Sequence, residues 1–159
     1  VVIGHGPLIV YKSYKRGVYG DAQGHDRTSE LGRGRMVRLG TYGDPAAVPS
    51  YIWESLLSES KGHTAYSHQS GVKGADYRPE FMMQSADNIE QARVAWDNGA
   101  RTFRIISDYS ELVKGKEIAC PAQTRSIECQ ACGLCKGASI AAKSIAVIKH
   151  GAGSKYINA

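Results

Sequence analysis

Cysteine is missing from most of this chain of 159 residues, because all 4 cysteines lie between residues 120 and 135. This distribution excludes a framework of disulfide bonds spread over the fold, as small secreted proteins have. Closely spaced cysteines in an otherwise cysteine-free chain favour metal binding in a reducing compartment. We therefore expect a cytoplasmic, metal-binding protein.

Long hydrophobic runs are also lacking. The longest apolar stretch, residues 140–148, contains Lys143 and is far shorter than the roughly 20 residues of a membrane-spanning helix. A hydrophobic content of 42% and a charged content of 22% exclude a disordered or fibrous chain. The sequence thus predicts a globular protein that is not embedded in a membrane.

A starting methionine and a signal peptide are absent from the first residues, Val1-Val2-Ile3-Gly4, so we expect a further segment upstream. The length suits a single α/β domain over residues 1–159 with its own hydrophobic core. Its expected parts are an irregular basic segment at 1–35, a β/α core at 36–110, a four-cysteine metal loop at 116–137, and a final strand with a tail at 144–159.

Strands and helices are predicted to alternate from residue 36 onward. Strands are expected at residues 36–40, 63–68, 81–84, 102–106 and 144–149, and helices at 50–60 and 87–98. Asp87 and Glu90 are expected to form a capping box at the start of the second helix, and Gly99 is expected to end it. This order indicates parallel strands joined by crossover helices, in either a partial (β/α) barrel or an open, mostly parallel sheet.

The four cysteines have spacings typical of a metal centre. Cys129, Cys132 and Cys135 are separated by two residues each, and Gly133 lets the backbone curl around a shared ion. This run matches that of bacterial ferredoxins, and Cys120, followed by proline, is the expected fourth ligand. A [4Fe-4S] cluster is favoured over Zn²⁺, whose ligands usually come in two pairs. With all four positions filled by cysteine, such a cluster would be structural or electron-carrying.

Polar side chains follow the predicted strands, where parallel α/β folds bind their ligands. Asp44, His68 and Gln69 are candidate catalytic residues, since carboxylates and imidazoles can transfer protons. Tyr42 and Ser85 also follow strands and are candidate cofactor-binding residues. Two structural alternatives stay open: Asp44, which precedes a proline, forms a turn or a helix cap, and His68 is merely hydrogen-bonded.

The predicted strand at residues 63–68 has two faces, because successive side chains alternate. These faces are formed by Thr64, Tyr66 and His68 and by His63, Ala65 and Ser67. A histidine at the end of a strand can serve as an acid, a base or a ligand. The first face is therefore the one from which His68 would act.

Basic residues gather in the first quarter of the chain, although the net charge is only +5. Tyrosines alternate with them, and such a mixture can follow a phosphate backbone and stack on bases. The residues predicted to contact nucleic acid are Lys12, Lys15, Arg16, Arg33 and Arg35. The alternative is a solvated face on which lysine stems cover apolar surface.

Several segments together carry a resemblance to a known group of proteins. They are residues 37–49, 63–69, 101–104, 120–122, 129–135 and 150–151. On these segments the chain resembles an uncharacterised family of cysteine-rich proteins of bacteriophages and prophages. The resemblance implies the cytoplasm of an infected or lysogenic bacterium, and further cysteines upstream of Val1.

The arrangement is also similar to the partial (β/α) barrels of radical S-adenosylmethionine enzymes, which hold a cofactor-binding cluster near the N-terminus and an auxiliary cluster near the C-terminus. This chain has no three-cysteine motif before its first predicted strand. Three hypotheses result: an iron-sulfur protein with a redox or radical-type activity at the strand ends, a zinc-stabilised nucleic-acid-binding module, and a non-catalytic phage accessory protein that acts by contact.

Overall fold

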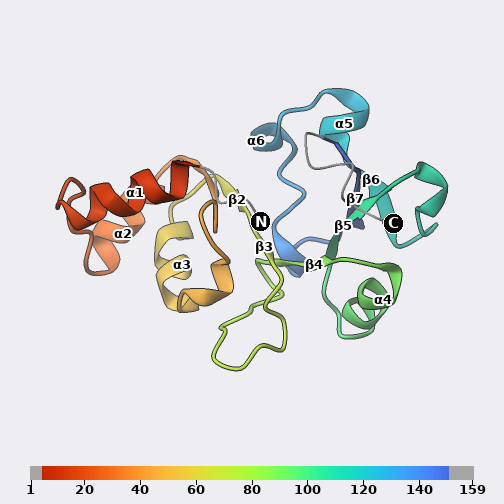
Figure 1. Ribbon diagram of the computed structural model, residues 1–159, viewed down its shortest axis with the longest axis horizontal. Helices are drawn as coiled ribbons and strands as arrows, with labels where there is room; N and C mark the ends of the chain where they lie inside the picture. The colour runs from red at the N-terminus through yellow and green to blue at the C-terminus, as the bar shows by residue number, and fades with distance from the viewer. Residues whose placement is uncertain (1–4, 151–159) are drawn as a thin grey trace.

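A computed structural model describes residues 5–150 of the chain (Figure 1). Its elements are α1 His5–Lys15, α2 His25–Gly32, β1 Met36–Arg38, η1 Pro45–Ala47, α3 Ser50–Leu57, β2 Gly62–Thr64, β3 Tyr66–Ser67, β4 Met83–Ala86, α4 Ile89–Asp97, β5 Thr102–Ile106, η2 Tyr109–Glu111, β6 Glu117–Ala119, α5 Pro121–Arg125, α6 Cys129–Cys132, η3 Gly137–Ser139 and β7 Ser144–Ile148. The tail expected after residue 150 lies outside the described residues. In the described part, no helix is long and apolar enough to cross a membrane.

All strand pairs of the two sheets are parallel, as the sequence predicts. One sheet has the order β1-β2, and the other has the order β3-β4-β5-β7-β6. Within residues 5–150 no strand pairing closes these sheets into a barrel. The fold is therefore an α/β fold with two parallel sheets, and the cysteines lie in the connection between β6 and β7.

The single strand expected at residues 63–68 is two strands in different sheets. The break falls at Ala65, whose N–H donates to the carbonyl of Cys135 (2.9 Å) and whose own carbonyl accepts from the N–H of Met83 (3.0 Å). Ala65 thereby leaves the first sheet and joins β3 to the second. This residue links the strand to the cysteine-bearing segment directly through the backbone.

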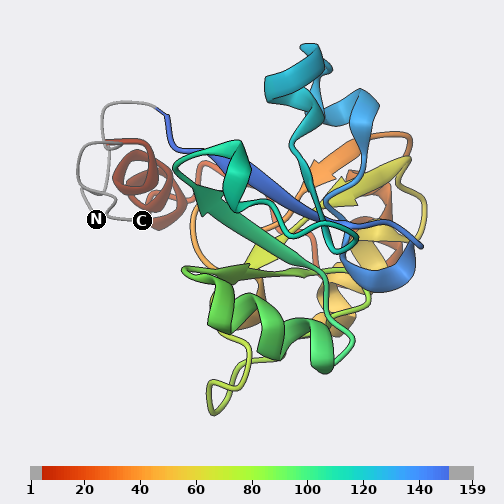
Figure 2. The same ribbon diagram turned by 90° about the vertical axis from the view of Figure 1, so that its right-hand side faces the viewer.

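The five-stranded sheet has two faces with different coverings. Figures 1 and 2 show α4 on one side and α5 with α6 on the other. We call the side of α4 the helix face, because Ala92 and Ala95 of α4 are buried there. We call the other side the pocket face; its residues are Tyr66, Phe103, Ile105, Ile145 and Val147.

Helix α4 begins one residue later than the sequence predicts. Its N-cap is Asn88, whose side chain accepts from the N–H of Gln91 (2.9 Å), while the side chain of Gln91 accepts from the N–H of Asp87 (2.9 Å). The expected capping box of Asp87 and Glu90 is therefore wrong, since Asn88 caps equally well. The expected end is confirmed, because Gly99 has a left-handed φ of 76°.

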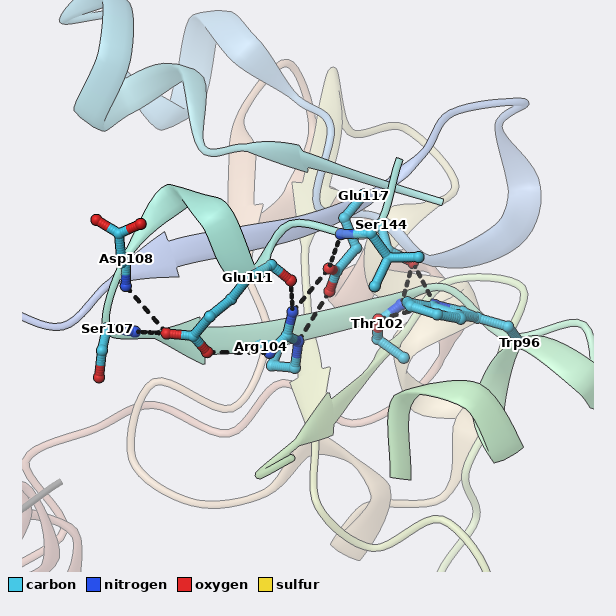
Figure 3. Close-up of polar contacts among 9 residues, drawn as sticks. Trp96, Thr102, Arg104, Ser107, Asp108, Glu111, Glu117 and Ser144 are labelled. Carbon is cyan, nitrogen blue, oxygen red and sulfur yellow. Dashed lines mark hydrogen bonds and ion pairs between the residues drawn. The ribbon is translucent and has the colours of Figure 1, made fainter. Parts of the chain in front are cut away.

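Buried polar groups cover the part of the helix face that α4 leaves open (Figure 3). Arg104 donates from Nε and Nη2 to the two carboxylate oxygens of Glu117 (3.0 and 2.8 Å). The indole N–H of Trp96 points at the hydroxyl groups of Thr102 (3.0 Å) and Ser144 (2.9 Å). These bonds tie β5, β6 and β7 together across one face.

Residues 5–35 are not irregular, which corrects the sequence-based expectation. They contain α1 and α2, and α2 packs closely on α3: a Cβ atom added at Gly32 would lie 1.8 Å from the carbonyl oxygen of Leu56. The hydroxyl group of Ser55 also donates to the carbonyl of His25 (3.0 Å). Figure 1 shows both helices at the end of the molecule farthest from β6. These contacts depend on residues distant in sequence.

Candidate metal centre and its pocket

Cys120 directly follows β6 and is fixed by β7. Its N–H donates to the carbonyl of Ala146 (2.8 Å). The next helix, α5, is held by Gln123, whose side chain donates to the carbonyl of Ile148 (2.9 Å) and accepts from its N–H (2.8 Å). The cysteine loop, which we define as residues 120–135, therefore begins on a rigid strand end.

The other three cysteines lie on and just after α6. Gly133 ends this short helix with a left-handed φ of 61°, and its N–H donates to the carbonyl of Cys129 (3.0 Å). This turn confirms the role predicted for the glycine. Cys135 then returns to the sheet, where its carbonyl accepts from the N–H of Ala65 (2.9 Å). The cysteine loop is thus anchored at both ends and arches over the pocket face.

A cavity of about 900 Å³ lies between the cysteine loop and the pocket face. All four cysteines line it, together with aromatic and aliphatic side chains of the sheet. Met83, Ile145 and Val147 form a hydrophobic cluster against which Cys120 and Cys135 pack. The structure therefore brings the four thiols to one cavity, as their spacing predicts, although Cys129 remains exposed to solvent.

The Cys135 thiol interacts with several neighbours. Its pKa is raised to about 11, first by burial and then by the nearby Cys120 and Cys132, against the opposing effect of a hydrogen bond with Tyr66. The Tyr66 hydroxyl is buried beside it, and its pKa is raised by burial first and then by Cys135. Both groups are therefore neutral near pH 7, and a bound metal would be needed to keep the buried thiol deprotonated.

Arg101 is a buried cation next to the cysteine loop. Its Nη1 donates to the carbonyls of Leu134 (2.8 Å) and Gly137 (2.7 Å), and its Nη2 donates to the carbonyl of Lys143. Its Nε has no hydrogen-bond partner, and within the described residues no carboxylate pairs with it. Burial lowers the pKa of Arg101, and only the charge of the Cys135 thiolate opposes that effect.

The chemistry and the charges of these residues fit a metal centre, but the distances between their side chains do not. Four thiols are ligands for Zn²⁺ and for iron-sulfur clusters, and the unpartnered Nε of Arg101 calls for a nearby anion. Within residues 5–150, however, no three cysteine, histidine or acidic side chains lie close enough to hold one ion, and all four cysteines are free thiols. Metal binding would require the cysteine side chains to move closer together.

Asp44 does not line the cavity and has a structural role. Its carboxylate accepts from the N–H of Ala46 (2.9 Å), the hydroxyl of Ser67 (2.7 Å) and the N–H of His68 (2.8 Å). It thereby caps η1 and joins the turn after β1 to the end of β3. Of the two roles open from the sequence, the geometry supports the turn and cap over catalysis.

The other predicted site residues divide between the cavity and its surroundings. His68 and Ser85 line the cavity, and the His68 imidazole lies 3.6 Å from the carboxylate of Asp87. Gln69 does not line it; its N–H donates to Ser67. Tyr42 is exposed and lies outside the cavity.

Several lining residues were missed from the sequence, although strand alternation could have found them. Thr64, Tyr66 and His68 all line the cavity, which confirms the face predicted for them. The same period of two, applied to β5, places Phe103 and Ile105 on the pocket face.

The basic residues predicted to contact nucleic acid lie away from the cavity, on and after α1 and α2. Arg33 donates from Nη2 to the carboxylate of Glu59 (3.2 Å), so it is already paired. Arg16 and Arg35 bond to the hydroxyl of Ser13 and the carbonyl of Leu31. Lys12 and Lys15 are exposed in the last turn of α1. A nucleic-acid partner therefore stays a prediction.

No protein-family model, no curated protein and no solved structure matches this chain. The resemblance to phage proteins and to radical enzymes therefore stays a prediction. The function has to be argued from the cysteine loop, the cavity and the buried arginine, whose geometry stands on its own.

Proposed function

We propose that the protein is an iron-sulfur protein in which the cysteine loop binds a [4Fe-4S] cluster beside a substrate cavity. The observation that carries this proposal is the buried Arg101, which lies beside Cys135 and has no carboxylate partner within residues 5–150. A buried charge costs several kcal/mol unless an opposite charge compensates it. A cluster held by four thiolates has a net negative charge and would supply that compensation.

The choice of iron-sulfur over zinc rests on the ligand spacing. Three cysteines on and after α6 follow the run of bacterial ferredoxins, with Cys120 as the separate fourth ligand. With four cysteine ligands the centre has no open position, so it would transfer electrons or hold the loop closed. Proton transfer would fall to His68 and Asp87, which lie together at the cavity wall. A radical mechanism rests on the resemblance alone and is not part of this proposal.

The proposal is tested by preparing the protein without oxygen and measuring iron, sulfide and zinc together with the visible absorption spectrum. Cys120, Cys129, Cys132 and Cys135 are each replaced by serine. Gln130→Ala is the matched control, because Gln130 is exposed on α6 between two of the cysteines. We expect four irons per chain, as the cluster formula states, with loss of the spectrum in each cysteine variant only. A colourless protein with one zinc per chain would establish the zinc alternative, and a metal-free protein would overturn both.

Nucleic-acid binding is a second candidate function, favoured by one observation. Helix α1 exposes Tyr11 and Tyr14 next to Lys12 and Lys15, so stacking and phosphate-binding groups share one surface helix. Binding to single-stranded DNA or RNA should weaken as salt rises, and the triple variant of Lys12, Lys15 and Arg16 to alanine should reduce that salt dependence. Unchanged binding in this variant would exclude α1 as the contact.

A further inference from the structure

Arg38 brings a positive charge without an ionic partner to the wall of the cavity. It lies at the end of β1, and its guanidinium carbon is 5.7 Å from the centre of the Tyr66 ring. Among the described residues it forms no ion pair. A guanidinium that stacks on a ring by its flat face keeps the N–H groups of its edge free to bind an anion.

The wall next to Arg38 is apolar and includes two aromatic rings. The rings of Tyr66 and Phe103 lie 4.6 Å apart between centroids, with an angle of 59° between their planes. Ile145 and Val147 continue this surface toward the cysteine loop. Apolar walls with a few polar anchors are typical of small-molecule sites, and about 900 Å³ is within their usual size.

Three other polar residues of the cavity wall, Asp87, His68 and Gln123, already have partners. The carboxylate of Asp87 lies beside His68 (3.6 Å), and both polar atoms of the Gln123 amide are bonded to the backbone of Ile148. Arg38 is therefore the charged group in the cavity wall with the most bonding capacity left. Its fork of N–H groups matches the geometry of a carboxylate or a phosphate.

We propose that the cavity binds an organic anion with a flat, apolar body, whose carboxylate or phosphate group is held by Arg38 and whose ring packs on Tyr66 and Phe103. This inference rests on the proposed function in one respect, namely that the cavity under the cysteine loop is the functional site. It adds the class of ligand, which neither the cysteines nor His68 define.

The test uses three probes that share one ring system: naphthoate, naphthyl phosphate and the neutral naphthamide. Calorimetry on the full chain, with its metal content measured on the same sample, gives the three affinities. We expect the favoured anion to bind at least about tenfold more tightly than naphthamide, which corresponds to about 1.4 kcal/mol. The preference between naphthoate and naphthyl phosphate identifies the anionic group.

Variants of Arg38 and Phe103 separate the contribution of the charge to ligand binding from that of the ring contact. Arg38→Gln should remove the tenfold preference while leaving naphthamide binding unchanged, and Arg38→Lys should keep part of the preference. Arg16→Gln is the matched control, since Arg16 is exposed after α1 and does not line the cavity. Phe103→Ala should weaken all three probes equally.

Equal affinities for the three probes, no binding of any of them, or an unchanged preference in Arg38→Gln would each overturn the inference. A different result would refute the proposed function, namely that the wild-type protein contains no metal. Arg38→Gln should keep the metal content of the wild type. Anion binding by a metal-free protein would therefore support the inference and refute the cluster.

Discussion

Two buried arginines lie three positions apart and are compensated in different ways. Arg104, on β5, is bonded to both carboxylate oxygens of Glu117. Arg101, just before β5, is bonded to backbone carbonyls alone, and its Nε has no partner. Carbonyl oxygens bring only partial charge, whereas a carboxylate neutralises the guanidinium fully.

This difference separates the two faces of the sheet. On the helix face the ion pair is complete within the protein, so both charges are compensated whether or not a metal is bound. On the side of the cysteine loop, the charge of Arg101 is compensated only when the nearby Cys135 thiol loses its proton and becomes an anion. The arginine with a carboxylate is therefore a structural feature, and the one without a carboxylate supports the proposal of a negatively charged centre beside it.

Breaking the ion pair between Arg104 and Glu117 should have the largest effect on stability. Glu117→Ala leaves Arg104 as an uncompensated buried charge and should reduce the free energy of unfolding by about 3–5 kcal/mol, measured by urea denaturation. The double variant Arg104→Met with Glu117→Leu removes both charges and should recover most of this loss. A single variant that costs less than the double variant would contradict the role given to the pair.

Replacing Arg101 should mainly weaken metal binding. Arg101→Met removes a cation beside the thiolates and should weaken metal retention about 10- to 100-fold, measured by competition with a chelator. The double variant of Arg104 and Glu117 is the control and should retain metal as the wild type does. If Arg101→Met lowered stability without changing metal retention, Arg101 would be a structural residue like Arg104.

A smaller effect is expected from the neutral bonds of the helix face. Trp96→Phe removes the hydrogen bonds to Thr102 and Ser144 and should reduce the free energy of unfolding by about 1–3 kcal/mol. Trp53→Phe, which removes a single bond to the carbonyl of Pro45, should cost less. Neither change should affect metal content, because both indoles lie outside the cavity wall. A loss of metal in Trp96→Phe would show that the two faces are coupled.

The smallest effect concerns pH and His63. Burial lowers the pKa of this imidazole, although its bond to the carbonyl of Phe81 opposes the shift. Below its ordinary value of about 6.5 the unfolded chain takes up a proton that the folded chain does not, so stability falls as pH falls. His63→Gln should reduce this loss between pH 7.5 and 5.5, by less than about 1.4 kcal/mol. An identical pH dependence in thermal unfolding of the two proteins would contradict this assignment.

Much of the fold follows from local sequence patterns, and the differences have long-range causes. The strand predicted at residues 102–106 is β5 itself, because most of its residues are β-branched or aromatic and favour a strand. The strand expected at 63–68 breaks at Ala65, because its two backbone groups bond to Cys135 and Met83. Helices α1 and α2 were missed because α2 depends on its packing against α3.

The candidate site was only partly predictable for a similar reason. The spacing of the cysteines predicted one shared metal centre; the structure places all four around one cavity, but within residues 5–150 no three of them lie close enough to hold an ion, so metal binding stays a prediction. Asp44 looked like a catalytic acid, since an aspartate after a strand has the same sequence pattern whether it binds a ligand or caps a turn. Arg101 was missed because burial of an arginine without a carboxylate appears only when the fold is known.

The order of strands in the sheet has a consequence for biosynthesis. β7 is translated after β5 and β6 but lies between them, so a ribosome completes both neighbours before the strand that joins them. A nascent chain that stops before Ser144 has two unpaired strand edges, which invite aggregation. At that moment all four thiols have been translated, while the carbonyl of Ala146 that will fix Cys120 has not. The five-stranded sheet that carries the cysteine loop can therefore be completed only after β7 has been translated.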